Sequence, residues 1–188
     1  MNWLAPWLKI SFVSMVVLFS RIGQTTGPHA SPQPPAAETS SKPASCAAPE
    51  YRQFDFWAGD WDAFDVDNPT TKVARTQVGL ILDRCVLREN YEGADGHKGQ
   101  SFSTYDASRK VWHQSWVTNR GELLVIEGKF DAGEMILSGV DHGRVGHPLV
   151  RGIWKPAEGG VRETAETSID DGQTWTPWFD LVFRAHKP

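Results

Sequence analysis

Paired carboxylates are the first residues in this chain whose types and spacing could do chemistry. Glu163 and Glu166 lie three residues apart, and Glu89 and Asp180 form a second candidate pair. Two carboxyl groups can divide the work of a general acid and a general base. Exposed charges on strands explain these residues more simply. The chain also contains no Gly-x-Ser-x-Gly turn, phosphate-binding loop or Cys/His pair. We therefore expect no catalytic centre, and an enzyme ranks behind the other functional classes.

Histidines are the next candidates, because imidazole is a common metal ligand. A metal site needs three or four convergent ligands. His142 and His147 lie together in a glycine-rich segment, which is typical of a solvated loop. No His-x-His or His-x-x-x-His pair lies on an expected strand or helix. The sequence therefore predicts no metal site.

A third motif lies near the C-terminus and reads Ser-Ile-Asp-Asp-Gly-Gln-Thr-Trp. It resembles the Asp-box of sialidase propellers, Ser-x-Asp-x-Gly-x-Thr-Trp. The Asp can accept backbone N–H groups across a turn, and the Gly can take a positive φ. The chain has one copy and is too short for a six-bladed propeller. We expect a structural hairpin held by Ser168, Asp170, Gly172, Thr174 and Trp175.

Tryptophan is unusually frequent after residue 50, with seven copies. Aromatic side chains with one polar group suit a ligand cavity. Ordinary packing of the core is the alternative. Trp112, Gln114 and Trp116 share one face of a strand, and we expect that face to point inward because His113 and Ser115 are easily solvated. The candidate cavity residues, with Arg88 as a charge clamp, are Trp61, Arg88, Tyr105, Gln114, Trp116, Trp154 and Glu166.

The elements that would position these residues are short strands. About ten apolar or alternating runs are separated by clusters of Gly, Asp, Asn and Pro, which favour turns. No window shows a convincing helical stripe, and the only helix candidates are short, at residues 50–57 and near Asp83. The expected strands are 54–65, 72–82, 86–91, 100–105, 111–118, 122–130, 134–140, 149–155, 161–169 and 175–184.

Ten strands joined by tight turns predict an all-β antiparallel meander. Open sheet edges invite aggregation, so a sheet of this size is expected to close or to stack. We expect closure into a calycin- or lipocalin-like barrel, whose interior can hold a small ligand.

The order of four sequence elements supports this fold through a resemblance. The elements are the Phe54–Asp62 opening, Asp83-Arg84-Cys85, the Trp112–Trp116 strand and the Ser168–Trp175 hairpin. They resemble a bacterial family of exported calycin-like barrel proteins without an assigned activity. Related nitrobindin-like barrels bind haem through a histidine near the chain end. His186 lies beyond the last expected strand without a matching motif, so we expect no cofactor.

The N-terminal region is expected to lie outside the barrel domain. Residues 1–23 contain the apolar run ISFVSMVVLF, which predicts a signal peptide, with an uncleaved N-terminal anchor as the alternative. Residues 24–50 are rich in Pro, Ser, Thr and Ala, which predicts a disordered linker. Residues 51–188 form the expected domain. The protein would be periplasmic or secreted, or anchored at the inner membrane.

The two cysteines, Cys46 and Cys85, invite a disulfide in an exported chain, with two free thiols as the alternative. Residues 51–188 hold 16 of the 19 basic and 21 of the 23 acidic residues, giving a net charge of −5. Nucleic acid is therefore disfavoured as a partner.

The sequence leaves the oligomeric state open. Membrane contact is expected only through an uncleaved N-terminus. The leading hypothesis is an exported protein that binds a small hydrophobic or amphipathic ligand. The alternative is a structural or interaction barrel with a filled core.

Overall fold

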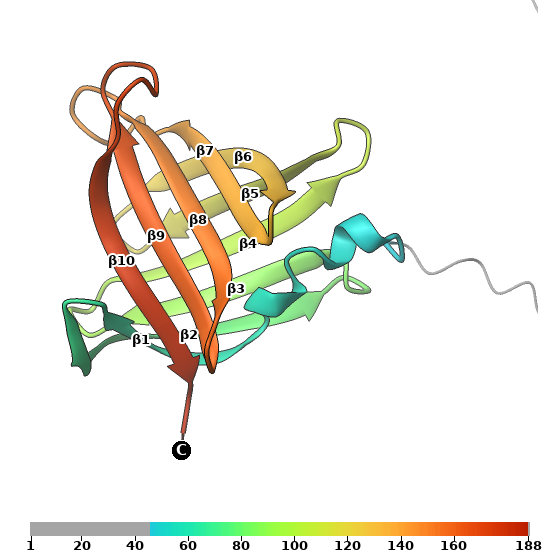
Figure 1. Ribbon diagram of the computed structural model, residues 1–188, viewed down its shortest axis with the longest axis horizontal. Helices are drawn as coiled ribbons and strands as arrows, with labels where there is room; N and C mark the ends of the chain where they lie inside the picture. The colour runs from blue at the N-terminus through green and yellow to red at the C-terminus, as the bar shows by residue number, and fades with distance from the viewer. Residues whose placement is uncertain (1–45, 188) are drawn as a thin grey trace, which may run out of the picture. The chain divides into compact units, whose positions relative to one another are not determined.

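The computed structural model describes residues 46–187, which form ten strands and two 3₁₀ helices (Figure 1). No helix in this part of the chain is long and apolar enough to cross a membrane. The elements are η1 (Pro49–Arg52), η2 (Asp55–Trp57), β1 (Gly59–Asp65), β2 (Asn68–Ile81), β3 (Val86–Gly93), β4 (Lys98–Asp106), β5 (Val111–Thr118), β6 (Leu123–Asp131), β7 (Glu134–Val140), β8 (Leu149–Ala157), β9 (Gly160–Ser168) and β10 (Thr176–Ala185).

The strands form a closed barrel in which each strand pairs antiparallel with its neighbours in sequence. The last strand, β10, closes the barrel by pairing with β1, and Trp61 lies opposite Ala185. Closure leaves neither β1 nor β10 as a free edge, which removes the aggregation hazard of an open sheet. The predicted all-β antiparallel barrel of about ten strands is confirmed.

Side-chain alternation along the strands separates the interior from the surface. In β8, Val150 and Trp154 are buried on either side of Gly152, and Arg151 projects to the outer face, where it pairs with Glu166. In β4, Ser101 and Ser103 are buried while Phe102 is exposed. Such period-2 patterns place one set of side chains inside and the other in solvent.

The up-and-down order gives the barrel two distinct ends. The connections β2–β3, β4–β5, β6–β7 and β8–β9 lie at the end where η2 leads into β1, here called the entry end. The other five connections lie at the opposite end, here called the far end, and include the hairpin of the Asp-box.

Aromatic side chains in and next to η2 close the entry end. Phe54 and Trp57 are almost fully buried, with 0% and 1% of their surface exposed. Phe54 packs edge-to-face on Trp112 of β5 and Trp154 of β8. The ring of Trp57 stacks on Trp61, whose indole N–H donates to the Trp57 carbonyl at 3.0 Å.

The expected first strand, 54–65, is therefore wrong in its first five residues. Residues Asp55–Trp57 form η2 instead, and β1 begins at Gly59. A Cβ on Gly59 would lie 2.3 Å from the Trp61 ring, so a glycine is needed for this approach.

A disulfide joins Cys46 to Cys85, with 5.2 Å between their Cα atoms, so the predicted bond is confirmed. It ties the segment before η1 to the β2–β3 turn at the entry end. Arg52 reinforces the same connection by donating to the Arg84 carbonyl. Both Arg52 and Arg84 also pair with Asp55. The predicted domain boundary at residue 51 falls inside η1, whereas the expected signal peptide and most of the expected linker lie outside the described residues.

Candidate functional site

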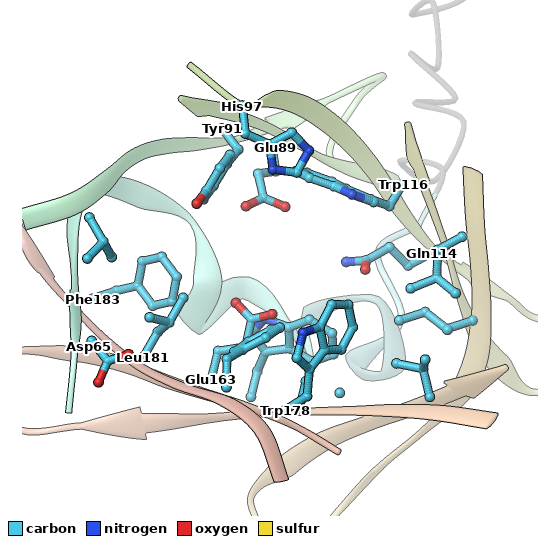
Figure 2. Close-up of a pocket in the computed structure, with 18 residues that line it drawn as sticks. Asp65, Glu89, Tyr91, His97, Gln114, Trp116, Glu163, Trp178, Leu181 and Phe183 are labelled. Carbon is cyan, nitrogen blue, oxygen red and sulfur yellow. The ribbon is translucent and has the colours of Figure 1, made fainter. Parts of the chain in front are cut away.

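A cavity of about 410 Å³ occupies the barrel interior beyond the aromatic plug of the entry end (Figure 2). Most of its wall is aromatic or aliphatic, with a small number of polar groups. This volume and composition are those of small-molecule sites. The lining residues come from all strands except β4 and β7 and from the β3–β4 turn: Asp65, Val73, Glu89, Tyr91, His97, Gln114, Trp116, Leu124, Ile126, Val150, Gly152, Trp154, Glu163, Ala165, Trp178, Phe179, Leu181 and Phe183.

The alternation of β3 and β9 brings two glutamates into this cavity. In β3, Glu89 and Tyr91 project inward on the same face as the buried Leu87. In β9, Glu163 shares the inner face with Val161 and Ala165. Figure 2 shows the two carboxyl groups pointing into the cavity from opposite walls.

The Glu89 carboxyl is held by hydroxyl groups from both neighbouring strands. Thr76 of β2 donates to Oε1 at 3.0 Å, and Ser101 of β4 donates to Oε2 at 2.8 Å. Both hydroxyl-bearing residues are almost fully buried. Burial raises the pKa of Glu89, and the hydrogen bonds from Ser101 and Thr76 oppose that rise. The carboxyl therefore has a fixed orientation and a destabilised charge.

Fewer hydrogen bonds stabilise a negative charge on Glu163 than on Glu89. Burial raises its pKa well above the ordinary value, and the negative charge of Glu89 raises it further. The side chain of Trp154, directly across the β8–β9 ladder, offers the one hydrogen bond that lowers this pKa. A cation bound in the cavity would stabilise the charged form of both carboxyl groups, which burial disfavours.

Gln114 supplies a third polar group to the wall. It is 5% exposed, and its Nε2 donates to the Ser103 hydroxyl at 3.0 Å. Its side chain points into the cavity (Figure 2). Beside it, the indole of Trp116 lies over Gly99 of β4, where a Cβ would approach the ring to 2.3 Å. Tyr91 and His97 pack edge-to-face on this indole.

A bulge in β10 adds one more aromatic ring to the wall, that of Trp178. Pro177 pairs with Glu166 and Phe179 pairs with Ala165, so Trp178 is the extra residue between two consecutive partners of β9. The consecutive residues Trp178 and Phe179 consequently both line the cavity. Trp178 remains 42% exposed, and Arg144 of the β7–β8 connection lies over its ring at 3.7 Å. These two residues mark the cavity's border with solvent.

The structure places three of the seven predicted cavity residues on the wall: Gln114, Trp116 and Trp154. The inward orientation predicted for Trp112, Gln114 and Trp116 is confirmed, although Trp112 belongs to the plug rather than to the wall. Trp61 and Tyr105 also miss the cavity, since they pack against the core cluster at the entry end.

Two predicted cavity residues lie outside the barrel, and these predictions are wrong. Arg88 is exposed on the outer face of β3, because its neighbours Leu87 and Glu89 occupy the inner one. Glu166 lies on the outer face of β9, where it pairs with Arg151 at 2.6 Å. The interpretation of Glu89 and Glu163 as exposed strand charges is also wrong. Their shared face with apolar neighbours at period 2 was the signal that could have identified them.

The Asp-box forms the far-end hairpin between β9 and β10. Asp170 accepts hydrogen bonds from the Thr174 hydroxyl at 2.6 Å and from the Thr174 backbone N–H at 2.9 Å. These bonds, with a further one from Ser168, lower the pKa of Asp170 to about 2. Gly172 has φ +84°, and its carbonyl accepts the Trp175 indole N–H. The motif has the geometry of a structural staple.

Most histidines make ordinary surface contacts. His186 pairs with Asp62, and His113 pairs with Glu127, whereas the rings of His142 and His147 pack at a tilt in the β7–β8 connection. Within residues 46–187 no group of three or more His, Cys, Asp or Glu side chains could hold a metal ion. Of the five histidines in the described part of the chain, only His97 reaches the cavity, and its Nε2 lies 3.2 Å from Glu122.

Fold and site together define a closed antiparallel barrel that is plugged at one end and hollow towards the other. Comparison with family models and with curated proteins yields no significant match. Functional inference therefore depends on the chemistry of the cavity.

Proposed function

We propose that this protein binds a small amphipathic molecule inside its barrel. The observation that carries the proposal is the cavity of about 410 Å³, which lies within the range of roughly 300–1,000 Å³ typical of ligand sites. Its rings offer apolar contact, and its few polar groups can orient a guest. A structural barrel with a filled core is the alternative, and an interior space of this size counts against it.

A neutral dye tests the proposal without assuming the charge of the ligand. N-phenyl-1-naphthylamine fluoresces more strongly in apolar surroundings, and we expect an increase on binding that saturates. Ala165→Phe adds a ring inside the cavity and is expected to remove most of the increase. Thr164→Phe adds the same ring on the outer face of β9 and should leave it unchanged. Binding that survives in a folded Ala165→Phe variant, or no binding at all, contradicts the proposal.

The two glutamates favour a second candidate, acid–base catalysis. Carboxyl groups with raised pKa values that face one cavity are characteristic of such sites. An enzyme would release an altered guest, whereas a carrier returns it intact. Mass spectrometry of guests recovered from the protein distinguishes the two. Native mass spectrometry of protein purified from its own cell would also identify the natural guest.

We further propose that the protein works outside the cytosol, either exported or held at the membrane by its N-terminus. The Cys46–Cys85 disulfide supports this, because such bonds persist in oxidising compartments. The apolar run at residues 10–19 supports it from the sequence. Cell fractionation decides the matter, and recovery from the cytosol with an intact N-terminus contradicts export.

A further inference from the structure

The charges around the cavity are strongly asymmetric. Three carboxyl residues, Asp65, Glu89 and Glu163, contribute to the wall, and none of the described lining residues is a lysine or an arginine. Arginines on the strands that carry these groups lie outside the barrel. Arg88 is exposed, and Arg162 pairs with Asp180 on the outer face. An anionic guest inside the cavity would therefore meet carboxyl groups and no lysine or arginine of the wall, since Arg144 lies only at the border with solvent.

The acceptors in the wall outnumber the donors that satisfy them. The hydroxyls of Thr76 and Ser101 serve Glu89, but no hydroxyl, lysine or arginine in the described chain donates to Glu163. Gln114 gives an independent indication. Its Nε2 is used by Ser103, whereas its Oε1 has no partner among the described residues, although the side chain is 95% buried and points into the cavity. These acceptors face the cavity, where a group bound in it can supply the hydrogen bonds that the protein does not.

Aromatic rings surround the same acceptors. Tyr91 lies two residues from Glu89 on β3 and packs on Trp116 with ring centroids 5.8 Å apart. Trp154 lies directly opposite Glu163 in the β8–β9 register. The faces of such rings attract cations, with tryptophan the strongest of the three aromatic side chains. Carboxylates, a free amide oxygen and indole rings together form a chemical match for an ammonium group.

We propose that the guest of this cavity is an organic cation, an amine or ammonium joined to an apolar body. The inference rests on the proposed binding function and specifies its ligand. The ammonium group lies between Glu89 and Glu163, where it donates to their carboxylates and to the Gln114 amide oxygen. The apolar body lies against the indoles of Trp116, Trp154 and Trp178. Fatty acids and other anions are excluded by the same two glutamates.

Three probes with one tail and different head groups test this proposal: 4-phenylbutylamine, 4-phenylbutanol and 4-phenylbutyrate. We expect calorimetry at pH 7.5 to show the amine binding at least about tenfold more tightly than the alcohol, because hydrogen bonds to charged groups are worth more than neutral ones. The carboxylate should bind most weakly. Alcohol or carboxylate affinity equal to that of the amine overturns the cation proposal but leaves the binding function standing. Failure of all three probes and of the neutral dye overturns both.

Isosteric variants show which carboxyl group contributes to amine binding. Glu163→Gln and Glu89→Gln should each weaken amine binding about tenfold or more and leave alcohol binding nearly unchanged. Glu166→Gln is the matched control, because it removes the same charge from the outer face of the same strand. Equal losses in Glu166→Gln and Glu163→Gln would point to the overall negative field and overturn the proposed contact. If one of the two inner variants fails to fold, the other still tests the contact from the opposite wall.

The pH dependence of binding gives a separate readout. The other ionisable residues that line the cavity are Glu89, Tyr91, Asp65 and His97, and Arg144 lies at its border. A proton on Glu163 competes with the cation, so amine affinity should rise as the pH is raised over the range in which an alkylamine stays protonated. Alcohol affinity should stay level, and Glu163→Gln should flatten the amine profile. A flat amine profile in the unmodified protein contradicts the proposal.

Discussion

The two ends of the barrel interior contain opposite kinds of side chain. At the entry end, Phe54, Trp57 and Trp112 fill the space between the strands with rings that are 1% exposed or less. Towards the far end, Trp116 and Trp178 keep part of their surface accessible, and the carboxyls of Glu89 and Glu163 line the same cavity. The same residue type thus fills one end and borders a cavity at the other. The difference predicts that stability depends on the entry end and that binding depends on the cavity.

Tryptophan removal at the two ends should therefore have unequal effects. Trp57→Ala creates a cavity in a tightly packed plug, and we expect it to lower the free energy of unfolding by about 3–5 kcal/mol. Trp116→Ala removes a ring that borders a cavity and is only partly buried, so its cost should be smaller, about 1–2 kcal/mol. Urea denaturation measures both values. Equal losses would show that the cavity wall is as important to stability as the plug.

The disulfide at the entry end should come next in effect. A Cys46→Ser/Cys85→Ser double variant loses a crosslink between residues 39 apart, and we expect a loss of about 2–4 kcal/mol from the free energy of unfolding. Dye binding by the folded fraction should be unchanged, because the bond lies away from the cavity. Reductant should destabilise the parent protein and leave the double variant unaffected. Weakened dye binding in the folded double variant would instead show that the two ends are coupled.

Glu163→Gln should change stability least and in the opposite direction. The folded-state pKa of Glu163 lies above its unfolded value, so the native state holds its proton to higher pH. Stability contributed by the neutral carboxyl is therefore lost as pH rises from the unfolded pKa through the folded one. The variant should melt at a higher temperature than the parent at pH 7.5, and the difference should shrink at pH 4. A lower melting temperature at pH 7.5 would mean that the carboxylate is stabilised by its surroundings.

The sequence predicts the parts of this site that follow from regular alternation. Trp112, Gln114 and Trp116 were placed correctly because β5 is an uninterrupted antiparallel strand. Arg88 was chosen for its charge, but the face it would need is occupied by Leu87 and Glu89. A buried glutamate is a rare and costly feature, so the period-2 pattern around Glu89 is easily taken for a solvated strand.

Other features depend on tertiary register and could not be found in this way. Trp178 reaches the cavity only because β10 bulges between Pro177 and Phe179, and that shift is set by the pairing with β9. The cavity volume likewise depends on how side chains from eight strands fit together. The Phe54–Asp62 opening is recognisable as a motif, but its packing inside the entry end depends on the closed barrel.

The pairing of β1 with β10 has a consequence for the order of folding. Every other pairing in the barrel joins strands that are consecutive in sequence, so each hairpin can form soon after its residues are synthesised. The final pairing brings Trp61 to Ala185 and cannot form until the last strand has left the ribosome. Closing so long a loop has a larger entropic cost than forming a hairpin, so we expect this pairing to form more slowly than the others. A nascent chain therefore stays open between β1 and β10 until β10 has been synthesised, even when the intervening hairpins have already formed.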